Sequence, residues 1–155
     1  MSTDLIWRTS STGLDDTARL AESLGSRLRG GEVIELVSDV GGGKTTFVKT
    51  LAKGFGSADA VASPSFTISR EYVSGDKIMY HFDFYRLTDP GIVANELAEA
   101  VGDRKGVVVV EWANIVENVL PVERVTINIR NTGDTTRELE LLYPDSLAYL
   151  IPDNA

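Results

Sequence analysis

The chain of 155 residues contains no cysteine. This absence excludes disulfide bonds, thiolate metal sites and a cysteine nucleophile. It is compatible with a reducing compartment, and we expect a cytoplasmic protein. Basic residues are also few, since 15 Lys and Arg stand against 23 Asp and Glu and give a formal net charge of −8. This charge argues against a broad electrostatic surface for nucleic acid, but it leaves room for a local basic patch or a basic protein partner.

Long apolar runs are absent too. No run approaches the ~18 consecutive apolar residues of a membrane-spanning helix, so we expect no contact with a membrane. Residues 1–4 lack the basic region and apolar core of a signal peptide, and we expect none. The apolar fraction of 43% is typical of a globular protein. We therefore expect a single domain over residues 1–155, with a short tail after residue 144.

A glycine-rich segment, SDVGGGKT, occupies residues 38–45. In a P-loop, which cradles nucleotide phosphates, a glycine is followed by four residues and then by Gly-Lys-Ser or Gly-Lys-Thr. Gly43, Lys44 and Thr45 take their places in this spacing, and Ser38 stands where the first glycine is usual. If that position requires a positive φ angle, serine is strained there; if it requires only a small side chain, the change has little effect.

The neighbouring segments have the character that a P-loop requires. Residues 32–37 are β-branched and apolar, as in a strand, and residues 45–55 carry apolar side chains at helical spacing. Gly54 and Gly56 are candidate stop signals for this helix. The context favours a phosphate-binding loop over a glycine-rich turn that merely carries a surface lysine.

The rest of the chain alternates between strand and helix patterns. We expect Ser10, Ser11 and Thr12 to offer N-caps for the first helix. The alternation predicts a three-layer α/β/α domain of the P-loop NTPase kind, with a mixed, mainly parallel central sheet. The expected strands are 5–8, 32–37, 66–73, 78–85, 106–110, 124–130 and 137–143. The first expected helix has Asp15 and Asp16 in its first turn and continues through residues 17–28, and the others are 45–55, 90–101 and a short one after residue 144.

Two carboxylates are candidates for Mg²⁺ chemistry. Glu111 ends the apolar strand 106–110, and ligands of open α/β sheets bind at the carboxyl ends of strands. It is therefore a Walker B candidate, although an acid that simply starts a loop gives the same pattern. Asp83 lies within an aromatic strand, on the same face as His81 and Tyr85 by alternation. A solvated face and a metal site both explain Asp83, and a hydrogen-bonded structural role is favoured for His81, the only histidine.

With these motifs, the chain resembles the TsaE family, P-loop ATPases required for threonylcarbamoyladenosine (t⁶A) formation in tRNA. Four segments carry the resemblance in order: 39–47, 63–67, 81–87 and 111–112. The third, HFDFYRL, is the most specific. The usual family loop has leucine and alanine where this chain has Val40 and Gly42, besides the change at Ser38, and residues 88–106 match the family poorly.

The resemblance implies roles for individual residues. Lys44 would bind phosphate, Thr45 and Glu111 would hold Mg²⁺, and Asp83 would serve hydrolysis or metal binding. Residues 63–67 would sense the γ-phosphate. The catalytic set is thus Lys44, Asp83 and Glu111, and the metal ligands are Thr45, Glu111 and Asp83. The ATP-binding set implied is Asp39, Val40, Gly41, Gly42, Gly43, Lys44, Thr45, Thr46 and Arg137.

The resemblance also implies a weak Mg²⁺-dependent ATPase that partner proteins activate. The partners would be TsaD and TsaB, which hydrolysis drives or resets, and tRNA would be met only indirectly through that complex. Two alternatives remain open from the residues: a small-molecule kinase, and a nucleotide-binding module without turnover. A GTPase is disfavoured, because the chain has no Asn-Lys-x-Asp motif for reading guanine.

Overall fold

The computed structural model describes residues 4–38, 44–57, 60–61, 68–84, 91–111 and 119–152. Strands and helices alternate along the chain, as predicted. The elements are β1 (Leu5–Ser11), α1 (Leu14–Ser26), β2 (Val33–Ser38), α2 (Lys44–Phe55), β3 (Ala60–Val61), β4 (Ile68–Ser74), β5 (Lys77–Asp83), α3 (Gly91–Gly102), β6 (Gly106–Glu111), β7 (Val125–Asn131), β8 (Arg137–Tyr143) and a 3₁₀ helix, η2 (Asp145–Leu150).

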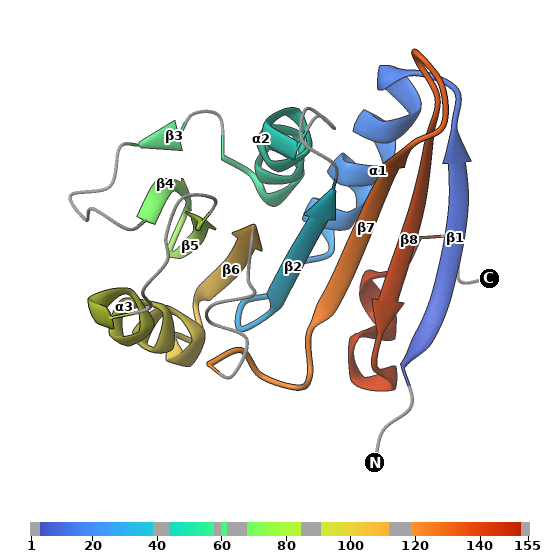
Figure 1. The fold of residues 1–155 in the computed structure, drawn as a ribbon. Coiled ribbons are helices and arrows are strands. Elements are labelled where there is room, and N and C mark those ends of the chain that lie inside the picture. The colour runs from blue at the N-terminus through green and yellow to red at the C-terminus, as the bar shows by residue number, and fades with distance from the viewer. Residues whose placement is uncertain are drawn as a thin grey trace.

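The strands form one mixed sheet in the order β1-β8-β7-β2-β6-β5-β4-β3 (Figure 1). The four central strands, β7, β2, β6 and β5, are parallel to one another. The outer pairs on both sides are antiparallel. The sheet is therefore parallel at its centre, where the predicted nucleotide loop follows β2, and antiparallel toward both edges.

Helices cover both faces, which confirms the three-layer prediction. On one face, α1 and α2 pack on a core that includes Leu36, Val109 and Ile127 of the central strands. On the other face, Leu97 and Ala100 of α3 pack on a smaller core. The strand Val107–Val110 is buried on both faces, as its unbroken valines predict. None of the helices in the described segments is long and apolar enough to span a membrane.

The ends of α1 differ from the prediction. The helix begins at Leu14 with Gly13 as N-cap, and no side chain caps it. Ser11 is not free to do so, because it still belongs to β1 and its hydroxyl bonds Gly13 O at 2.6 Å and Thr17 Oγ1 at 2.7 Å. The Thr12 hydroxyl donates to Asp16 instead. Strand pairing with β8, which the sequence does not reveal locally, also makes β1 three residues longer than expected.

The glycines near the end of α2 have different roles. Gly56 ends the helix with a φ of 106°, as predicted. Gly54 is not a stop signal, because it lies within α2 and against the backbone of Glu22 in α1. The sequence after Pro144 forms the expected short helix, η2, whose Leu150 is fully buried.

Candidate nucleotide site

Three of the predicted nucleotide-binding residues lie at the start of α2. Lys44, Thr45 and Thr46 form its first turn, and the helix follows β2 across residues 39–43. Asp39, Val40, Gly41, Gly42 and Gly43 lie outside the described residues, as does the predicted switch loop, residues 63–67. A helix N-terminus presents unpaired backbone N–H groups and a partial positive charge, both of which suit a phosphate.

Ser38 is the last residue of β2 and pairs in register with Ile129 of β7. The first position of the glycine-rich motif therefore has strand backbone. Serine adopts such a conformation without the strain that a positive φ would impose. Of the two readings of Ser38, the small-residue position fits the structure.

Glu111 and Asp83 lie at the carboxyl ends of two neighbouring parallel strands, at the same edge of the sheet. They are the last residues of β6 and β5, and they are partners in the parallel register of these strands. Glu111 also pairs with Leu36 of β2, two residues before Ser38. The two predicted carboxylates are thus brought together at the edge where β2 leads toward α2.

Both carboxylates also share the face of the sheet that α2 covers. Side chains alternate along a strand, and Val109 and Met79 belong to the core beneath α1 and α2. Glu111 lies two residues beyond Val109, and Asp83 lies four residues beyond Met79, so both belong to the same face as this core. On this face Glu111 is buried, with 3% of its surface exposed, whereas Asp83 is exposed.

The histidine that alternation placed beside Asp83 contacts Glu111. His81 Nε2 lies 2.5 Å from Glu111 Oε2. His81 is itself buried, with 6% of its surface exposed. The hydrogen bond expected for His81 is thus present, and its partner is one of the two predicted carboxylates. The charge of Glu111 also acts on Tyr72. Burial raises the pKa of the Tyr72 hydroxyl, the nearby Arg70 lowers that pKa, and Glu111 raises it.

The donor set at this edge suits Mg²⁺. Magnesium prefers oxygen ligands, and it is usually held by one or two carboxylates together with substrate phosphates and water. Two carboxylates in register at the carboxyl ends of neighbouring strands meet the protein part of that description. Within the described ranges, no cluster of three or more His, Cys, Asp or Glu residues forms a metal site by itself.

Arg137 lies apart from the two carboxylates, although near the same edge. It begins β8 and pairs with Asn131, two residues beyond the partner of Ser38. Its guanidinium donates to the carbonyl oxygens of Thr136 at 3.0 Å and Gly133 at 3.5 Å. It lines a pocket of about 620 Å³ between the start of α1 and the β7–β8 turn, with Thr12, Gly13, Asp15, Asp16, Arg19, Asp134 and Thr135.

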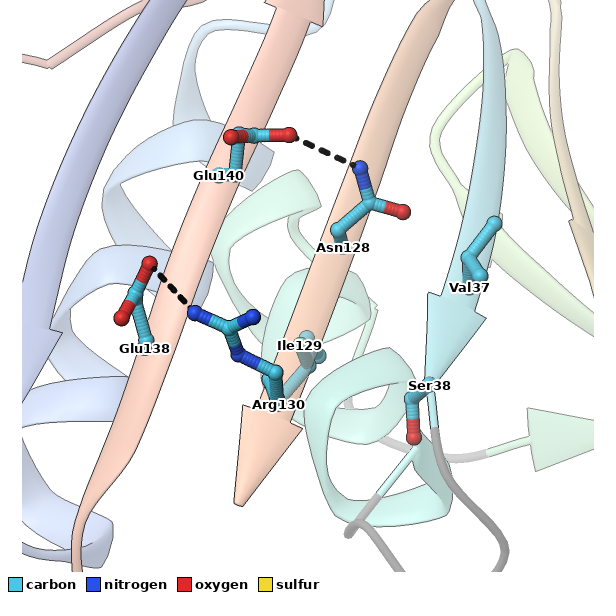
Figure 2. A pocket seen from close by; sticks show the side chains of 7 residues that line it. All are labelled: Val37, Ser38, Asn128, Ile129, Arg130, Glu138 and Glu140. Atoms are coloured by element: carbon cyan, nitrogen blue, oxygen red, sulfur yellow. Dashed lines mark hydrogen bonds and ion pairs between the residues drawn. The ribbon is translucent and has the colours of Figure 1, made fainter. Parts of the chain in front are cut away.

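A second pocket, of about 340 Å³, opens on the other face of the sheet. Figure 2 shows polar side chains of β7 and β8 lining it, with ion pairing between Arg130 and Glu138 at 3.0 Å and a hydrogen bond from Asn128 to Glu140 at 3.3 Å. Val37 and Ser38 border it from β2. This pocket was not predicted from the sequence. Its sequence signal is the alternation of polar and buried residues in 125–131 and 137–143.

Known proteins resemble this chain along most of its length. Residues 11–139 match the model of the family described as "Threonylcarbamoyl adenosine biosynthesis protein TsaE". The tRNA threonylcarbamoyladenosine biosynthesis protein TsaE of Bacillus subtilis is 39% identical over 136 residues, which cover 87% of this chain and 83% of the relative. The protein of the same description from Treponema pallidum is 37% identical over 129 residues, covering 83% and 95%. The crystal structure of Bacillus subtilis YdiB matches with a TM-score of 0.67 at 35% identity, covering 94% of this chain and 89% of that one.

Proposed function

The chain belongs to the TsaE family of tRNA threonylcarbamoyladenosine biosynthesis proteins, and from this premise we propose that it serves the modification as a weak Mg²⁺-dependent ATPase. One observation carries the proposal. Glu111 and Asp83 are register partners at the edge of the sheet where β2 ends, on the face that α2 covers. Carboxylates in that position are suited to hold the metal ion of a nucleotide whose phosphates meet the start of α2.

The roles of the residues follow from this arrangement. The backbone of Gly41, Gly42 and Gly43 would surround the phosphates, and Lys44 would neutralise their charge. Thr45, Glu111 and Asp83 would hold Mg²⁺, which supplies electrostatic stabilisation of the charge that develops on the transferring phosphoryl group. Of the two carboxylates, the exposed Asp83 is better placed to meet the attacking water, and the buried Glu111 is better suited to a fixed ligand.

The pocket beside Arg137 offers a place for the rest of the nucleotide. It opens near the edge of the sheet that holds Ser38, and a base or ribose there would lie between the start of α1 and the β7–β8 turn. Its lining includes Thr12 and Asp16, whose side-chain oxygens bond each other and can also accept hydrogen bonds from ribose or base atoms. We assign Arg137 to nucleotide binding on this basis.

Hydrolysis in this proposal resets a TsaD–TsaB complex between rounds of modification. The net charge of −8 favours contact with basic protein surfaces over direct contact with tRNA. We therefore propose that tRNA is met only through the complex, and that the partners raise the ATPase rate of the chain.

The test is phosphate release from ATP, with and without Mg²⁺ and a TsaD–TsaB preparation. We expect slow release by the chain alone, faster release with the partners, and loss of both in Lys44→Ala. Lys49→Ala is the matched control, because Lys49 is an exposed lysine of the same helix. Release that Lys44→Ala leaves unchanged would refute the proposal, as would the absence of Mg²⁺-dependent nucleotide binding. Transfer of phosphate to an added small molecule would favour the kinase instead.

A further inference from the structure

The contact between His81 and Glu111 joins two buried polar side chains on neighbouring strands. The side chains are 8% and 4% exposed, and His81 Nε2 lies 2.5 Å from Glu111 Oε2. The pairing suits a carboxylate oxygen that accepts a hydrogen bond from an imidazole N–H. The contact therefore fixes one carboxylate oxygen of Glu111.

The other nitrogen of the imidazole ring, Nδ1, is buried. It has no hydrogen-bond partner among the residues that the structure describes. Buried polar atoms that serve only the fold are nearly always paired, and an unpaired one weakens stability. The histidine is thus a poor structural residue in energetic terms, and its one hydrogen bond among the described residues is directed at Glu111.

We propose that His81 is a positioning residue for Glu111: by holding Oε2, it limits the orientations of the carboxylate that would bind the Mg²⁺ of a nucleotide. The proposal rests on the proposed function, in which Glu111 is a metal ligand. A glutamate side chain has three rotatable torsions, and a fixed second oxygen removes most of that freedom. Groups that hold metal ligands in this way commonly change metal affinity by about 10- to 100-fold when they are removed.

Glutamine and asparagine differ in how far the amide nitrogen lies from Cα, so they provide matched variants for the two nitrogens of His81. In glutamine, the amide nitrogen is as many bonds from Cα as Nε2 of histidine, so His81→Gln keeps a donor where Glu111 accepts. In asparagine, the amide nitrogen corresponds to Nδ1, so His81→Asn keeps a buried amide but places it on the wrong side of the ring. His81→Phe keeps the ring shape and removes both nitrogens. All three change the same buried position, and only the glutamine variant restores the contact.

The measurement is ADP affinity by calorimetry, in Mg²⁺ and in EDTA, with thermal unfolding of each variant as the check on folding. We expect His81→Asn and His81→Phe to lose about tenfold in affinity with Mg²⁺. Their affinity in EDTA should stay within about twofold of the wild-type value, because phosphate contacts do not pass through Glu111. His81→Gln should retain most of the Mg²⁺-dependent gain. This pattern separates positioning from a structural role, which would weaken binding equally under both conditions.

Three results would overturn the inference. One is equal Mg²⁺ dependence in all variants, and another is a loss in His81→Gln as large as in His81→Phe. The third is an equal loss with and without Mg²⁺. If the wild-type chain shows no Mg²⁺-dependent ADP binding, the proposed function and this inference fail together. Wild-type binding without the expected order of variants overturns the inference alone.

Discussion

Gly54 of α2 lies against the backbone of Glu22 in α1, where a Cβ atom on Gly54 would come within 2.0 Å of the Glu22 carbonyl oxygen. The contact is reciprocal, because a Cβ atom on Gly25 of α1 would come within 2.0 Å of the Leu51 carbonyl oxygen. Two helices approach this closely only where side chains are absent. The crossing sets the position of α2, and hence of the turn that begins with Lys44.

We expect Gly54→Ala to destabilise the protein although alanine is the better helix former. The methyl group meets backbone rather than a flexible side chain, so the helices must separate. Overpacking of this kind lowers the free energy of unfolding by about 1–3 kcal/mol. Urea denaturation followed by circular dichroism measures the change.

The control for this variant is Gly102→Ala, at the end of α3. A Cβ atom on Gly102 meets nothing within 4 Å. We expect it to leave stability unchanged or to raise it by about 0.4–1 kcal/mol, because alanine restricts the unfolded chain. If Gly54→Ala matches Gly102→Ala, the close approach of the two helices is not a constraint on the fold.

Ser38→Gly restores the usual first residue of the glycine-rich motif, and we expect no benefit from it. Ser38 is a strand residue paired with Ile129, so its backbone needs no positive φ. Glycine in a strand should lower the free energy of unfolding by roughly 0.5–1 kcal/mol and leave ADP affinity unchanged. Stability and calorimetric affinity of the single variant test this. A gain in either would show that Ser38 is strained.

The fold could be predicted from the sequence because its main signals are local. Apolar periodicity and glycine-rich turns identified the strands and helices, and the layers followed from their alternation. The predictions were wrong where contacts with a segment distant in sequence determine the local structure. Ser11 does not cap α1 because β8 holds it in a strand. Gly54 resembles a stop signal until α1 is placed against it.

The geometry of the candidate site was predicted only where local pattern determines it. Alternation within one strand placed His81 and Asp83 on the same face. The contact of His81 with Glu111 depends on the register of β5 against β6 across 30 residues of sequence, which no local pattern fixes. The position of Arg137 in a pocket with the start of α1 likewise depends on the pairing of β1 with β8.

Alkaline pH should weaken the fold through Tyr80. Its hydroxyl donates to Asp103 at 3.0 Å. Burial, then this hydrogen bond, then the charge of Asp103, raise its pKa from 10.0 to about 12. A raised pKa means that the folded state keeps a proton that the unfolded state loses, so the stabilising contribution is complete below pH 10 and is lost as pH rises toward 12.

Urea midpoints at intervals between pH 8 and pH 11 would show this loss, and Tyr80→Phe should make the decline less steep. The comparison at pH 8 isolates the hydrogen bond itself, because both states keep the phenol proton there. An equal slope in the two proteins would assign the alkaline loss to other groups. Tyr149 is one of these, because burial and its hydrogen bond to Glu32 also raise its pKa.

Substitution of Asp83 and of Glu111 should lower the free energy of unfolding by different amounts but slow ATP hydrolysis to a similar extent. Asp83 is exposed, so Asp83→Asn should change the free energy of unfolding by no more than about 0.5 kcal/mol. Glu111→Gln replaces a charge-assisted hydrogen bond to buried His81 with a neutral one and should lower it by about 1 kcal/mol. In the proposed function both groups would hold the same Mg²⁺, so each variant should slow single-turnover ATP hydrolysis by at least about tenfold.

Glu138→Gln is the control for this pair, because Glu138 lies on the opposite face of the sheet and forms a largely exposed ion pair with Arg130. Exposed pairs contribute less than about 1 kcal/mol, so this variant should change neither stability nor hydrolysis by much. Hydrolysis that survives in Glu111→Gln would mean that the metal ligand lies elsewhere. Hydrolysis lost in Glu111→Gln but kept in Asp83→Asn would leave the exposed carboxylate without a role in the chemistry. Only parallel losses, with unequal stability, agree with a buried ligand and an exposed acid acting on one nucleotide.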